Sequence, residues 1–419
     1  MQIYTARYIL PVTSPVQSDG AIAVNDGFIS HVGARAEVEA AAPDGTPVHD
    51  LGNSVILPGL VNAHTHLELS WLGAEKLPLG DYVDWLRALL ERRERSDATR
   101  AAEAAEQAIR FVVDRGTVAV GDVGNEGWIA PLVARSPLYG VLFHELYGLD
   151  ANEAETTLAR AAEKLEHLAA DDDVVAAGDR LCLALTPHAP HTTSTPLLRA
   201  LAGRAAAADE PLSIHVSESN AEVALLDDGS GPLAELFRER NFTGDDWRPP
   251  GRSPLEHLKR LGALSSNTLA VHCVHLDQPD HSNLQSTRAT VVTCPRSNAA
   301  LGVGTAPVPD LMREGIPVAL GTDSLASTPD LDMFAEMCAL QHEHPDLSAA
   351  AILRMATLNG ARALGLGDRL GSIEVGKLAE LIVVPCSGET ENPLDVLCAH
   401  PDKVYRLDRA PSELAGTDS

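Results

Sequence analysis

The sequence predicts an α/β protein, a (β/α)8 TIM-like barrel that carries a small β-sandwich built from both ends of the chain. Two patterns predict this fold. Apolar runs of strand length alternate with helical patterns through the middle of the chain, and we find eight such runs, the number that closes a barrel. Short strand and turn patterns occupy the first 57 residues and recur near the other end.

The eight strand-like runs come in an order that leaves room for a helix after most of them. They cover residues 55–63, 117–122, 140–145, 181–186, 212–216, 268–274, 290–293 and 318–321. Between them leucine or isoleucine recurs at helical spacing, and several segments open with Asp, Thr or Ser, which are favoured N-cap residues. The expected helices cover residues 97–114, 151–170, 195–208, 307–313 and 348–364. We expect these helices to pack on the outside of the barrel.

The chain ends carry hairpin signals. Asn25-Asp26-Gly27 separates two apolar runs, a pattern typical of a tight β-turn. At the other end, residues 371–377 lead into the apolar run 381–385. We therefore expect residues 1–56 and 366–410 to form one small composite domain, and residues 57–365 to form the barrel. The Gly- and Pro-rich segments at 228–232 and 248–252 predict an elaborated loop after the fifth strand, where a lid would lie.

The charge balance excludes some partners. The chain has 59 acidic and 32 basic residues, a net charge of −27, which repels nucleic acid phosphates and anionic membrane surfaces. No basic segment followed by an apolar one opens the chain, and no apolar run reaches about 18 residues. We expect a cytoplasmic protein that acts on a small molecule, and we leave a homodimer open.

Two histidines at the end of the first strand are the first chemical signal. His64 and His66 are spaced i, i+2, so in an extended strand both imidazoles point to the same side. Two neutral imidazoles aimed at one point suit zinc or ferrous iron. An isolated His-x-His is more often a pair of solvated loop histidines, because a metal site needs further ligands.

Other strand ends supply such ligands. The carboxyl ends of barrel strands meet at one face, where barrel enzymes place their chemistry. At these ends lie His144 and Glu145 (strand three), His188 and His191 (strand four), His215 and Glu218 (strand five), His272 (strand six) and Asp323 and Ser324 (strand eight). A set of this kind predicts a metal site.

With these motifs, the chain resembles the amidohydrolase superfamily. The resemblance rests on Leu57 to His66, on the His215 and His272 strands, on Gly321-Thr322-Asp323 and on residues 371–377. It implies the composite β-sandwich and one divalent metal held by His64, His66, His215 and Asp323. Binuclear relatives add a carboxylated lysine at the end of strand four, and this chain has none at 181–188, so we expect a mononuclear site. Zinc is preferred, and iron also fits.

The resemblance also implies hydrolytic deamination. A divalent metal brings the pKa of a bound water from about 15.7 towards 7. Asp323 would accept the proton of this water and His272 would orient it. Glu218 completes a His-x-x-Glu motif with His215 and would protonate a ring nitrogen of the substrate.

Finer motifs narrow the substrate. His64-Thr65-His66-Leu67-Glu68 and Thr186-Pro187-His188-Ala189-Pro190 resemble adenine nucleoside deaminases, most of all aminodeoxyfutalosine deaminases of menaquinone biosynthesis. This resemblance implies that His188 contacts the ribose and that Glu68 binds a ribose hydroxyl or the purine edge. Arg296, with Arg87 and Arg93 as alternatives, is the candidate for a carboxylate on the substrate tail. Glu145 and Ser324 are expected in the pocket by position, and His144, beside Glu145 at the end of the third strand, is expected to face it too.

Three other readings stay open. The first is a deaminase of S-adenosylhomocysteine, methylthioadenosine or adenosine, with the same chemistry and a different tail pocket. The second is a chlorohydrolase-type dehalogenase. The third is a non-catalytic scaffold of the same fold, which would be expected to lack ligands that this chain has.

Overall fold

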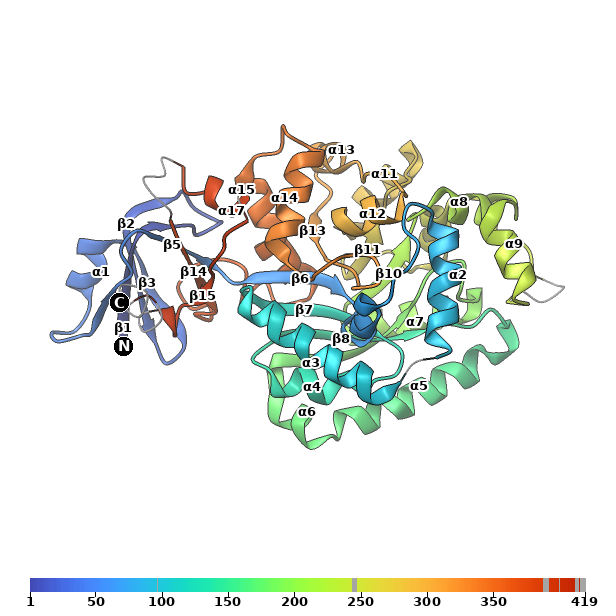
Figure 1. The fold of residues 1–419 in the computed structure, drawn as a ribbon, viewed down its shortest axis with the longest axis horizontal. Helices are drawn as coiled ribbons and strands as arrows, with labels where there is room; N and C mark the ends of the chain where they lie inside the picture. Colours follow the sequence, from blue (N-terminus) through green and yellow to red (C-terminus); the bar gives the residue numbers. More distant parts are fainter. Residues whose placement is uncertain (96, 243–246, 387–391, 399, 411–413, 415–419) are drawn as a thin grey trace.

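The structure, a computed structural model, describes residues 1–95, 97–242, 247–386, 392–398, 400–410 and 414. Figure 1 shows two parts side by side. A small sheet that contains the strands nearest both chain ends lies at one end of the molecule. A larger body of strands surrounded by helices forms the rest.

The larger body contains two sets of four parallel strands. One set is β6 (Leu60–Thr65), β7 (Thr117–Gly124), β8 (Tyr139–Leu146) and β9 (Leu181–Pro187), paired in that order. The other is β10 (Leu212–Val216), β11 (Thr268–His272), β12 (Thr290–Thr293) and β13 (Val318–Leu320), also paired in order. Eight parallel strands connected through helices confirm the predicted barrel class.

Two short junctions join the sets into a barrel. Between β9 and β10, the backbone N–H of His215 donates to the carbonyl of His188 at 2.9 Å. Between β13 and β6, Thr65 and Asp323 form a parallel bridge, and the N–H of Thr322 donates to the carbonyl of His64 at 3.0 Å. The strands approach so closely here that a Cβ on Gly321 would lie 2.7 Å from the carbonyl oxygen of His64. Glycine is therefore required at this junction.

Helices pack around the barrel. They are α2 (Tyr82–Arg93), α3 (Ala98–Asp114), α4 (Ile129–Arg135), α5 (Ala154–Ala169), α6 (Asp172–Ala177), α7 (Thr195–Ala208), α8 (Asn220–Asp227), α9 (Gly231–Glu239), α10 (Pro254–Leu261), α11 (Gln278–Thr287), α12 (Pro295–Leu301), α13 (Val308–Arg313), α14 (Met333–Glu343), α15 (Ala349–Arg354) and α16 (Gly360–Ala363). The predicted helix at 97–114 is confirmed, with the Asp97 side chain accepting from the N–H of Arg100. The helix predicted at 348–364 has a π-helical turn, Met355–Asn359, between α15 and α16.

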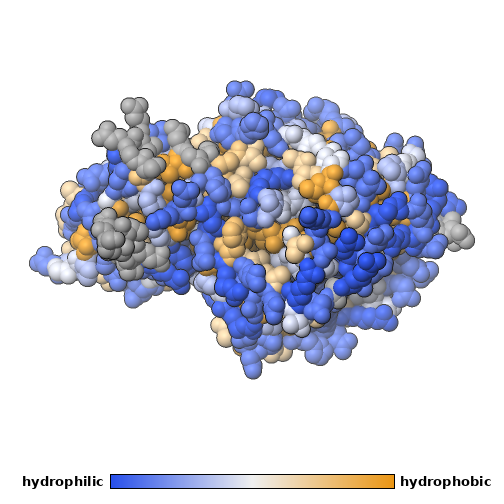
Figure 2. All heavy atoms as spheres, in the orientation of Figure 1, coloured by the Kyte–Doolittle hydropathy of each residue, from blue (hydrophilic) through white to orange (hydrophobic). Residues whose placement is uncertain are grey.

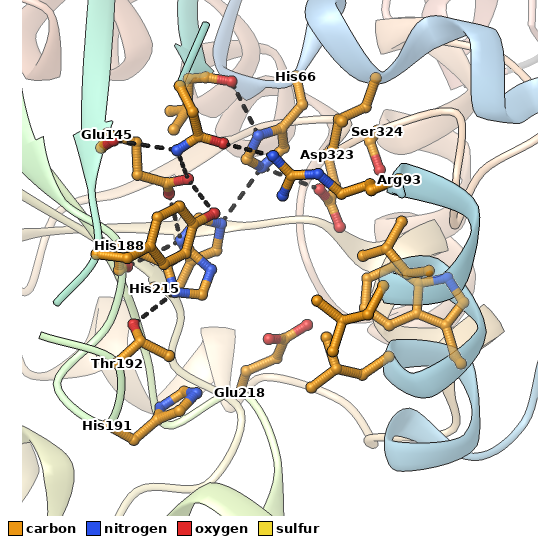
Figure 3. A pocket seen from close by; sticks show the side chains of 18 of the residues that line it. His66, Arg93, Glu145, His188, His191, Thr192, His215, Glu218, Asp323 and Ser324 are labelled. Carbon is orange, nitrogen blue, oxygen red and sulfur yellow. Dashed lines mark hydrogen bonds and ion pairs between the residues drawn. The ribbon is translucent and has the colours of Figure 1, made fainter. Parts of the chain in front are cut away.

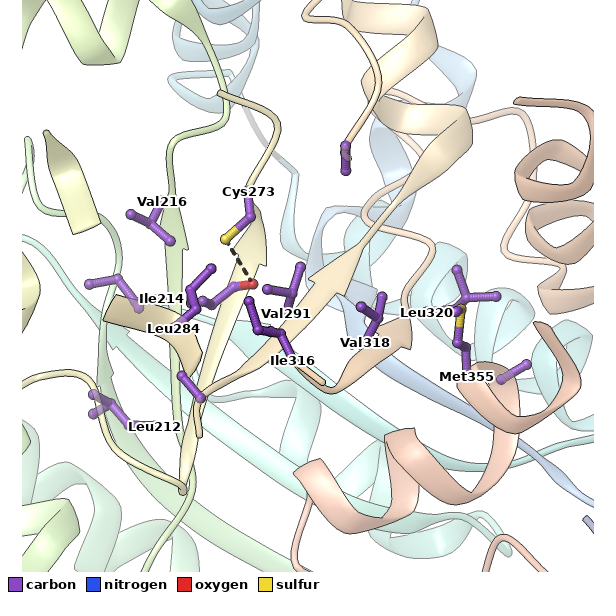
Figure 4. Close-up of a cluster of buried hydrophobic side chains, with 14 of the residues drawn as sticks. Leu212, Ile214, Val216, Cys273, Leu284, Val291, Ile316, Val318, Leu320 and Met355 are labelled. Carbon is purple, nitrogen blue, oxygen red and sulfur yellow. Dashed lines mark hydrogen bonds between the residues drawn. The ribbon is translucent and has the colours of Figure 1, made fainter. Parts of the chain in front are cut away.

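Alternate residues of a barrel strand face either the surrounding helices or the barrel interior. On β10, Leu212, Ile214 and Val216 pack with Leu284 of α11 in the layer between strands and helices (Figure 4). Successive strand residues point to opposite faces, so His215 between them faces the barrel interior. The same strand thus supplies both core packing and a functional side chain.

The small sheet joins both chain ends, as predicted. Its order is β15-β14-β5-β1-β2-β3, and β4 pairs with β1. The strands are β1 (Gln2–Ile9), β2 (Gln17–Asn25), β3 (Phe28–Ala34), β4 (Val48–Asp50), β5 (Ser54–Pro58), β14 (Leu381–Pro385) and β15 (Tyr405–Arg406). The short helix α1 (Arg35–Ala41) follows β3, and α17 (Asp395–Cys398) lies between β14 and β15.

Two local predictions have different outcomes. The hairpin at Asn25-Asp26-Gly27 is confirmed, with φ of 51° at Asp26 and 82° at Gly27. The single strand predicted at 55–63 is wrong, because the run contains two strands: β5 pairs with β14 in the small sheet, and β6 begins the barrel. The domain boundaries stay a prediction, and the expected cut between residues 56 and 57 falls inside β5.

The face seen in Figure 2 is mostly hydrophilic with small scattered hydrophobic patches, in line with the high charge of the chain. Over the residues that the structure describes, no helix is both long and apolar enough to cross a membrane.

Candidate active site

A cavity of about 500 Å³ opens at the carboxyl ends of the barrel strands. Its floor carries polar side chains from these strand ends, among them His66, His215, His272 and Asp323. One wall is apolar and consists mainly of side chains of α2, which lies over the mouth of the barrel (Figure 3). Phe237 and Phe242, from the segment predicted to be an elaborated loop, close another side; that segment contains α9, and its residues 243–246 lie outside the described part of the chain.

The four predicted metal ligands come together at the cavity floor. Nε2 of His66 lies 3.3 Å from Nε2 of His215 and 3.5 Å from Oδ1 of Asp323. Nε2 of His64 lies 4.0 Å from the same Asp323 oxygen. His64 is fully buried and the other three are at most 8% exposed. The predicted ligand set is thus one compact cluster.

Backbone carbonyls fix the direction of two of the rings. Nδ1 of His66 lies 2.9 Å from the carbonyl oxygen of Val123, and Nδ1 of His215 lies 3.0 Å from that of His188. A carbonyl only accepts, so each Nδ1 must carry the proton in the neutral ring. Each Nε2 then presents a lone pair, and two lone pairs facing each other at 3.3 Å repel unless a cation lies between them. The separation also matches the edge of a tetrahedron with Zn–N bonds of about 2.0–2.1 Å.

His64 supports the same conclusion. Both of its ring nitrogens are buried, and neither has a hydrogen-bond partner among the described residues. Burial and the neighbouring histidines lower its pKa well below the usual value, so the ring is neutral and can offer a lone pair. An orphaned neutral imidazole beside a carboxylate fits a divalent cation. The residues present therefore fit the one metal that the sequence implies.

Asp323 is held in a strained but well-bonded conformation. Its backbone has a φ of 61°, in the left-handed region that is costly for residues other than glycine. Its Oδ2 accepts from the hydroxyls of Ser297 and Ser327, the latter at 3.1 Å, which leaves Oδ1 directed at the histidines. Burial alone would raise the pKa of Asp323, but His66 and His272 outweigh it and hold the pKa below its usual range. Asp323 is therefore an anionic carboxylate in this cluster.

His272 and Glu218 lie beside the ligand cluster. Nε2 of His272 is 3.6 Å from Oε1 of Glu218. Nδ1 of the same histidine is 2.9 Å from Oδ1 of Asn298. His272 also has a left-handed backbone, with a φ of 72°. Burial, and then the charge of Asp323, raises the pKa of Glu218 to about 8. Glu218 therefore keeps its proton at neutral pH, as a proton donor must.

The predicted substrate-binding residues mostly line the cavity. Glu68, Glu145, His188 and Ser324 do so. The carboxylate of Glu68 also accepts from the backbone N–H groups of Asn125 and Glu126, at 2.9 and 3.0 Å, so it holds the loop after β7 as well. Nδ1 of His188 lies 2.7 Å from the Thr192 hydroxyl, which orients the ring.

Arg296 does not have the predicted place. It is not among the residues lining the cavity, and its guanidinium donates to Asp330 at 2.7 Å. Arg87 pairs with Glu239. Arg93 does line the cavity, where it donates to Oδ1 of Asn125 at 2.9 Å. The arginine at the cavity is therefore Arg93, because the last turn of α2 points inward while the residue after β12 turns away.

The prediction that His144 faces the pocket is also wrong. His144 lines a separate small cavity on the other side of β8, whereas Glu145 faces the site. Strand alternation requires this opposite placement of neighbours.

Several residues in or beside the cavity are not among the predicted site residues. Tyr147 donates to Glu145 at 2.7 Å, and Asn125 donates to the same carboxylate at 3.2 Å. Ser297 and Asn298, which bond Asp323 and His272, follow the end of β12, so their place at a strand end is a signal that the sequence does carry. Tyr82 and Asn125 lie in segments whose path the sequence does not specify.

Comparison with known proteins places this site in a family. The model of the amidohydrolase family matches residues 55–402, which include every strand of the barrel. The chain belongs to the amidohydrolase family. The expected enzyme class, a hydrolase of C–N bonds, is confirmed with it.

Named relatives are similar over most of the chain. A 5-methylthioadenosine/S-adenosylhomocysteine deaminase of Syntrophobacter fumaroxidans is 35% identical over 87% of this chain and 80% of its own length. An aminodeoxyfutalosine deaminase of Deinococcus radiodurans is 31% identical over 83% of this chain and 82% of its own length. A crystal structure of an adenosine deaminase from Xanthomonas campestris with bound zinc is similar with a TM-score of 0.77 and 26% identity, covering 99% of this chain and 96% of that one.

Proposed function

We propose that this amidohydrolase is a metal-dependent deaminase of adenine nucleosides, which it converts to hypoxanthine nucleosides with release of ammonia. The observation that carries the proposal is the placement of the Glu218 carboxyl group, 3.6 Å from Nε2 of His272 and beside the cluster of His64, His66, His215 and Asp323. Deamination of a ring amidine needs both an activated water and a proton donor to the ring nitrogen. Relatives named as deaminases of adenine nucleosides support the same reaction.

The residues have distinct roles in this reaction. When bound, the metal supplies a Lewis acid that makes hydroxide available at neutral pH. Asp323 accepts the proton of the attacking water, and His272 orients that water through Nε2. Glu218 donates its proton to the ring nitrogen next to the reacting carbon. The resulting carboxylate takes the remaining proton of the former water from the tetrahedral hydroxyl and passes it to the departing amine, and the proton that Asp323 accepted then restores the acid form of Glu218. Zinc is our proposed metal, and iron has the same donor preferences here.

We propose aminodeoxyfutalosine as the preferred substrate. Its tail carries an aromatic ring with a carboxylate. Trp85, Leu86, Leu89 and Leu90 of α2 offer an apolar wall for such a ring, and Arg93 at the end of the same helix offers a cation. His188 and Glu68 would then contact the ribose.

A second candidate is methylthioadenosine. The same apolar wall accepts a methylthio group, and four relatives with 32% to 35% identity are named for methylthioadenosine and S-adenosylhomocysteine. A homodimer remains a proposal.

A panel of substrates tests these assignments. The wild-type enzyme loaded with zinc is assayed separately with aminodeoxyfutalosine, methylthioadenosine, S-adenosylhomocysteine, adenosine and a chlorotriazine. For the nucleosides, the ultraviolet change from adenine to hypoxanthine is followed. For the chlorotriazine, the release of chloride is followed. We expect the highest kcat/KM with aminodeoxyfutalosine and no turnover by Glu218→Ala. Faster turnover of methylthioadenosine would move the substrate assignment to the second candidate. Turnover of the chlorotriazine alone would overturn deamination.

A further inference from the structure

The catalytic carboxyl group of Glu218 is held by more than its own strand. It follows β10 by two residues, after Ser217, whose backbone φ of 53° turns the chain sharply. The groups that face it come from different elements: Tyr82 of α2, His215 of β10, Glu222 of α8, His272 of β11 and Asp323 after β13. Two of these, Tyr82 and Glu222, have no part in the proposed chemistry.

Glu222 bonds the backbone of Glu218. Its Oε2 accepts the N–H of Glu218 at 2.9 Å. The Glu222 side chain is only 1% exposed, in the first turn of α8, and its own N–H donates to the hydroxyl of the N-cap Ser219. Its Oε1 lies 3.6 Å from Nδ1 of His191, another residue of the cavity wall. A buried carboxylate is costly to desolvate, so one that accepts the N–H directly after the strained Ser217 has a specific role in placing Glu218.

Tyr82 lies beside the carboxyl group itself. From the first turn of α2 its hydroxyl lines the same cavity as the Glu218 carboxyl, near enough for each group to affect the pKa of the other. Tyr82 packs on a hydrophobic cluster that joins α2, α8 and α9, which includes Val83, Leu225, Leu233 and Phe237. Because this cluster also carries the helix of Glu222, the two residues are fixed relative to each other. In Figure 1 the three helices lie together over one side of the barrel.

We propose that Glu222 and Tyr82 are positioning residues that fix Glu218, one through its backbone N–H and the other through its carboxyl group. The inference rests on the proposed function, because it needs Glu218 to transfer protons. Glu218 must serve the ring nitrogen first and the departing amine second, so its carboxyl has to stay within hydrogen-bond reach of both. A displacement of about 1 Å costs up to about 100-fold in rate.

Two substitutions of Glu222 test the first contact. Glu222→Gln keeps an oxygen that accepts the N–H of Glu218, whereas Glu222→Met has a similar length and no acceptor of comparable strength. We expect kcat to stay within about threefold of wild type in Glu222→Gln and to fall about 10- to 100-fold in Glu222→Met. KM and metal content should change little in either variant. Equal kcat in the two variants would overturn the role of Glu222.

Tyr82→Phe tests the second contact. A hydroxyl that donates to a carboxylate stabilises the charged form. Its loss should lower kcat about tenfold and move the alkaline limb of the pH profile of kcat/KM to higher pH, which a merely structural role would not do. Tyr139→Phe, at the start of β8 and outside the lining of the cavity, is the matched control and should leave both quantities unchanged. An unchanged pH profile together with an unchanged kcat in Tyr82→Phe would overturn the role of Tyr82.

Different outcomes overturn the positioning roles of Glu222 and Tyr82 and the proposed deaminase activity. Variants are measured with the best substrate that the wild-type enzyme hydrolyses. If the wild type is active and the Glu222 and Tyr82 variants keep full kcat, the positioning roles are wrong and the proposed function stands. If the wild type deaminates no adenine nucleoside, the proposed function falls, and the positioning roles fall with it.

Discussion

Nε2 of His66 and Nε2 of His215 face each other at 3.3 Å, while Nδ1 of each ring faces a backbone carbonyl. The strands thus hold two nitrogen lone pairs facing each other, and a cation between them would remove their repulsion. The metal is therefore expected to stabilise the fold as well as to take part in the reaction.

Metal removal should lower stability as well as activity. Treatment with a chelator should release about one equivalent of divalent metal, abolish turnover and lower Tm. A ligand at 100 times its Kd stabilises the folded state by about 2.7 kcal/mol, so we expect the free energy of unfolding to fall by an amount of this order when the metal is removed. Calorimetry before and after re-addition of zinc measures the effect. An unchanged Tm after complete metal loss would contradict a cation between the two rings.

The pH dependence of the reaction should report Glu218. Burial and Asp323 raise the pKa of its carboxyl to about 8, so the acid form predominates below that pH and is lost as the pH rises through it. Since the proton donor is the acid form, kcat/KM should fall tenfold per pH unit well above pH 8. A pH-rate profile in buffers of constant ionic strength checks this. A flat profile to pH 10 would show that another group supplies the proton.

Arg93 and Arg296 form a matched pair for substrate binding. Arg93→Met removes a guanidinium from the cavity wall and should raise KM about tenfold or more for a substrate with an anionic tail, with a smaller effect on adenosine. Arg296→Met should leave KM unchanged and lower stability modestly, because Arg296 bonds Asp330 outside the cavity lining. Steady-state kinetics with both substrates separate the two. A larger KM effect in Arg296→Met would reverse the assignment.

Gly321→Ala should weaken the junction between the last and first strands. Its Cβ would meet the carbonyl oxygen of His64 at 2.7 Å and the Cβ of His64 at 2.9 Å, both parts of a buried backbone junction. Such overpacking typically costs about 1–3 kcal/mol. Denaturant unfolding measures the loss, and Gly203→Ala on α7, where a Cβ meets nothing within 4 Å, is the control. Equal stability of the two variants would contradict a tight junction.

The sequence was most informative where a residue's place follows from strand geometry. His64, His66, His215 and Asp323 could be grouped because strand ends of a barrel meet at one face. Strand alternation also separates His144 from Glu145, because neighbouring residues of a strand point to opposite faces. The continuous apolar character of the run at 55–63 predicts one strand, although Gly59 divides this run between two sheets.

Side chains on helices and loops were harder to place. Arg93 and Arg296 have the same chemistry, and only the packing of α2 over the mouth of the barrel decides which of them reaches the cavity. Tyr82 likewise depends on how α2, α8 and α9 pack together. These relations are tertiary, so no local pattern in the sequence encodes them.

The bridge between Thr65 and Asp323 has a consequence for the order in which this protein can be made. The two residues are 258 positions apart in the chain, and they bring the first and the last members of the ligand set together. A growing chain therefore cannot assemble the complete set until the eighth strand has been synthesised and has returned to the first. Metal uptake during synthesis would accordingly be a late event, and its timing would report closure of the ring.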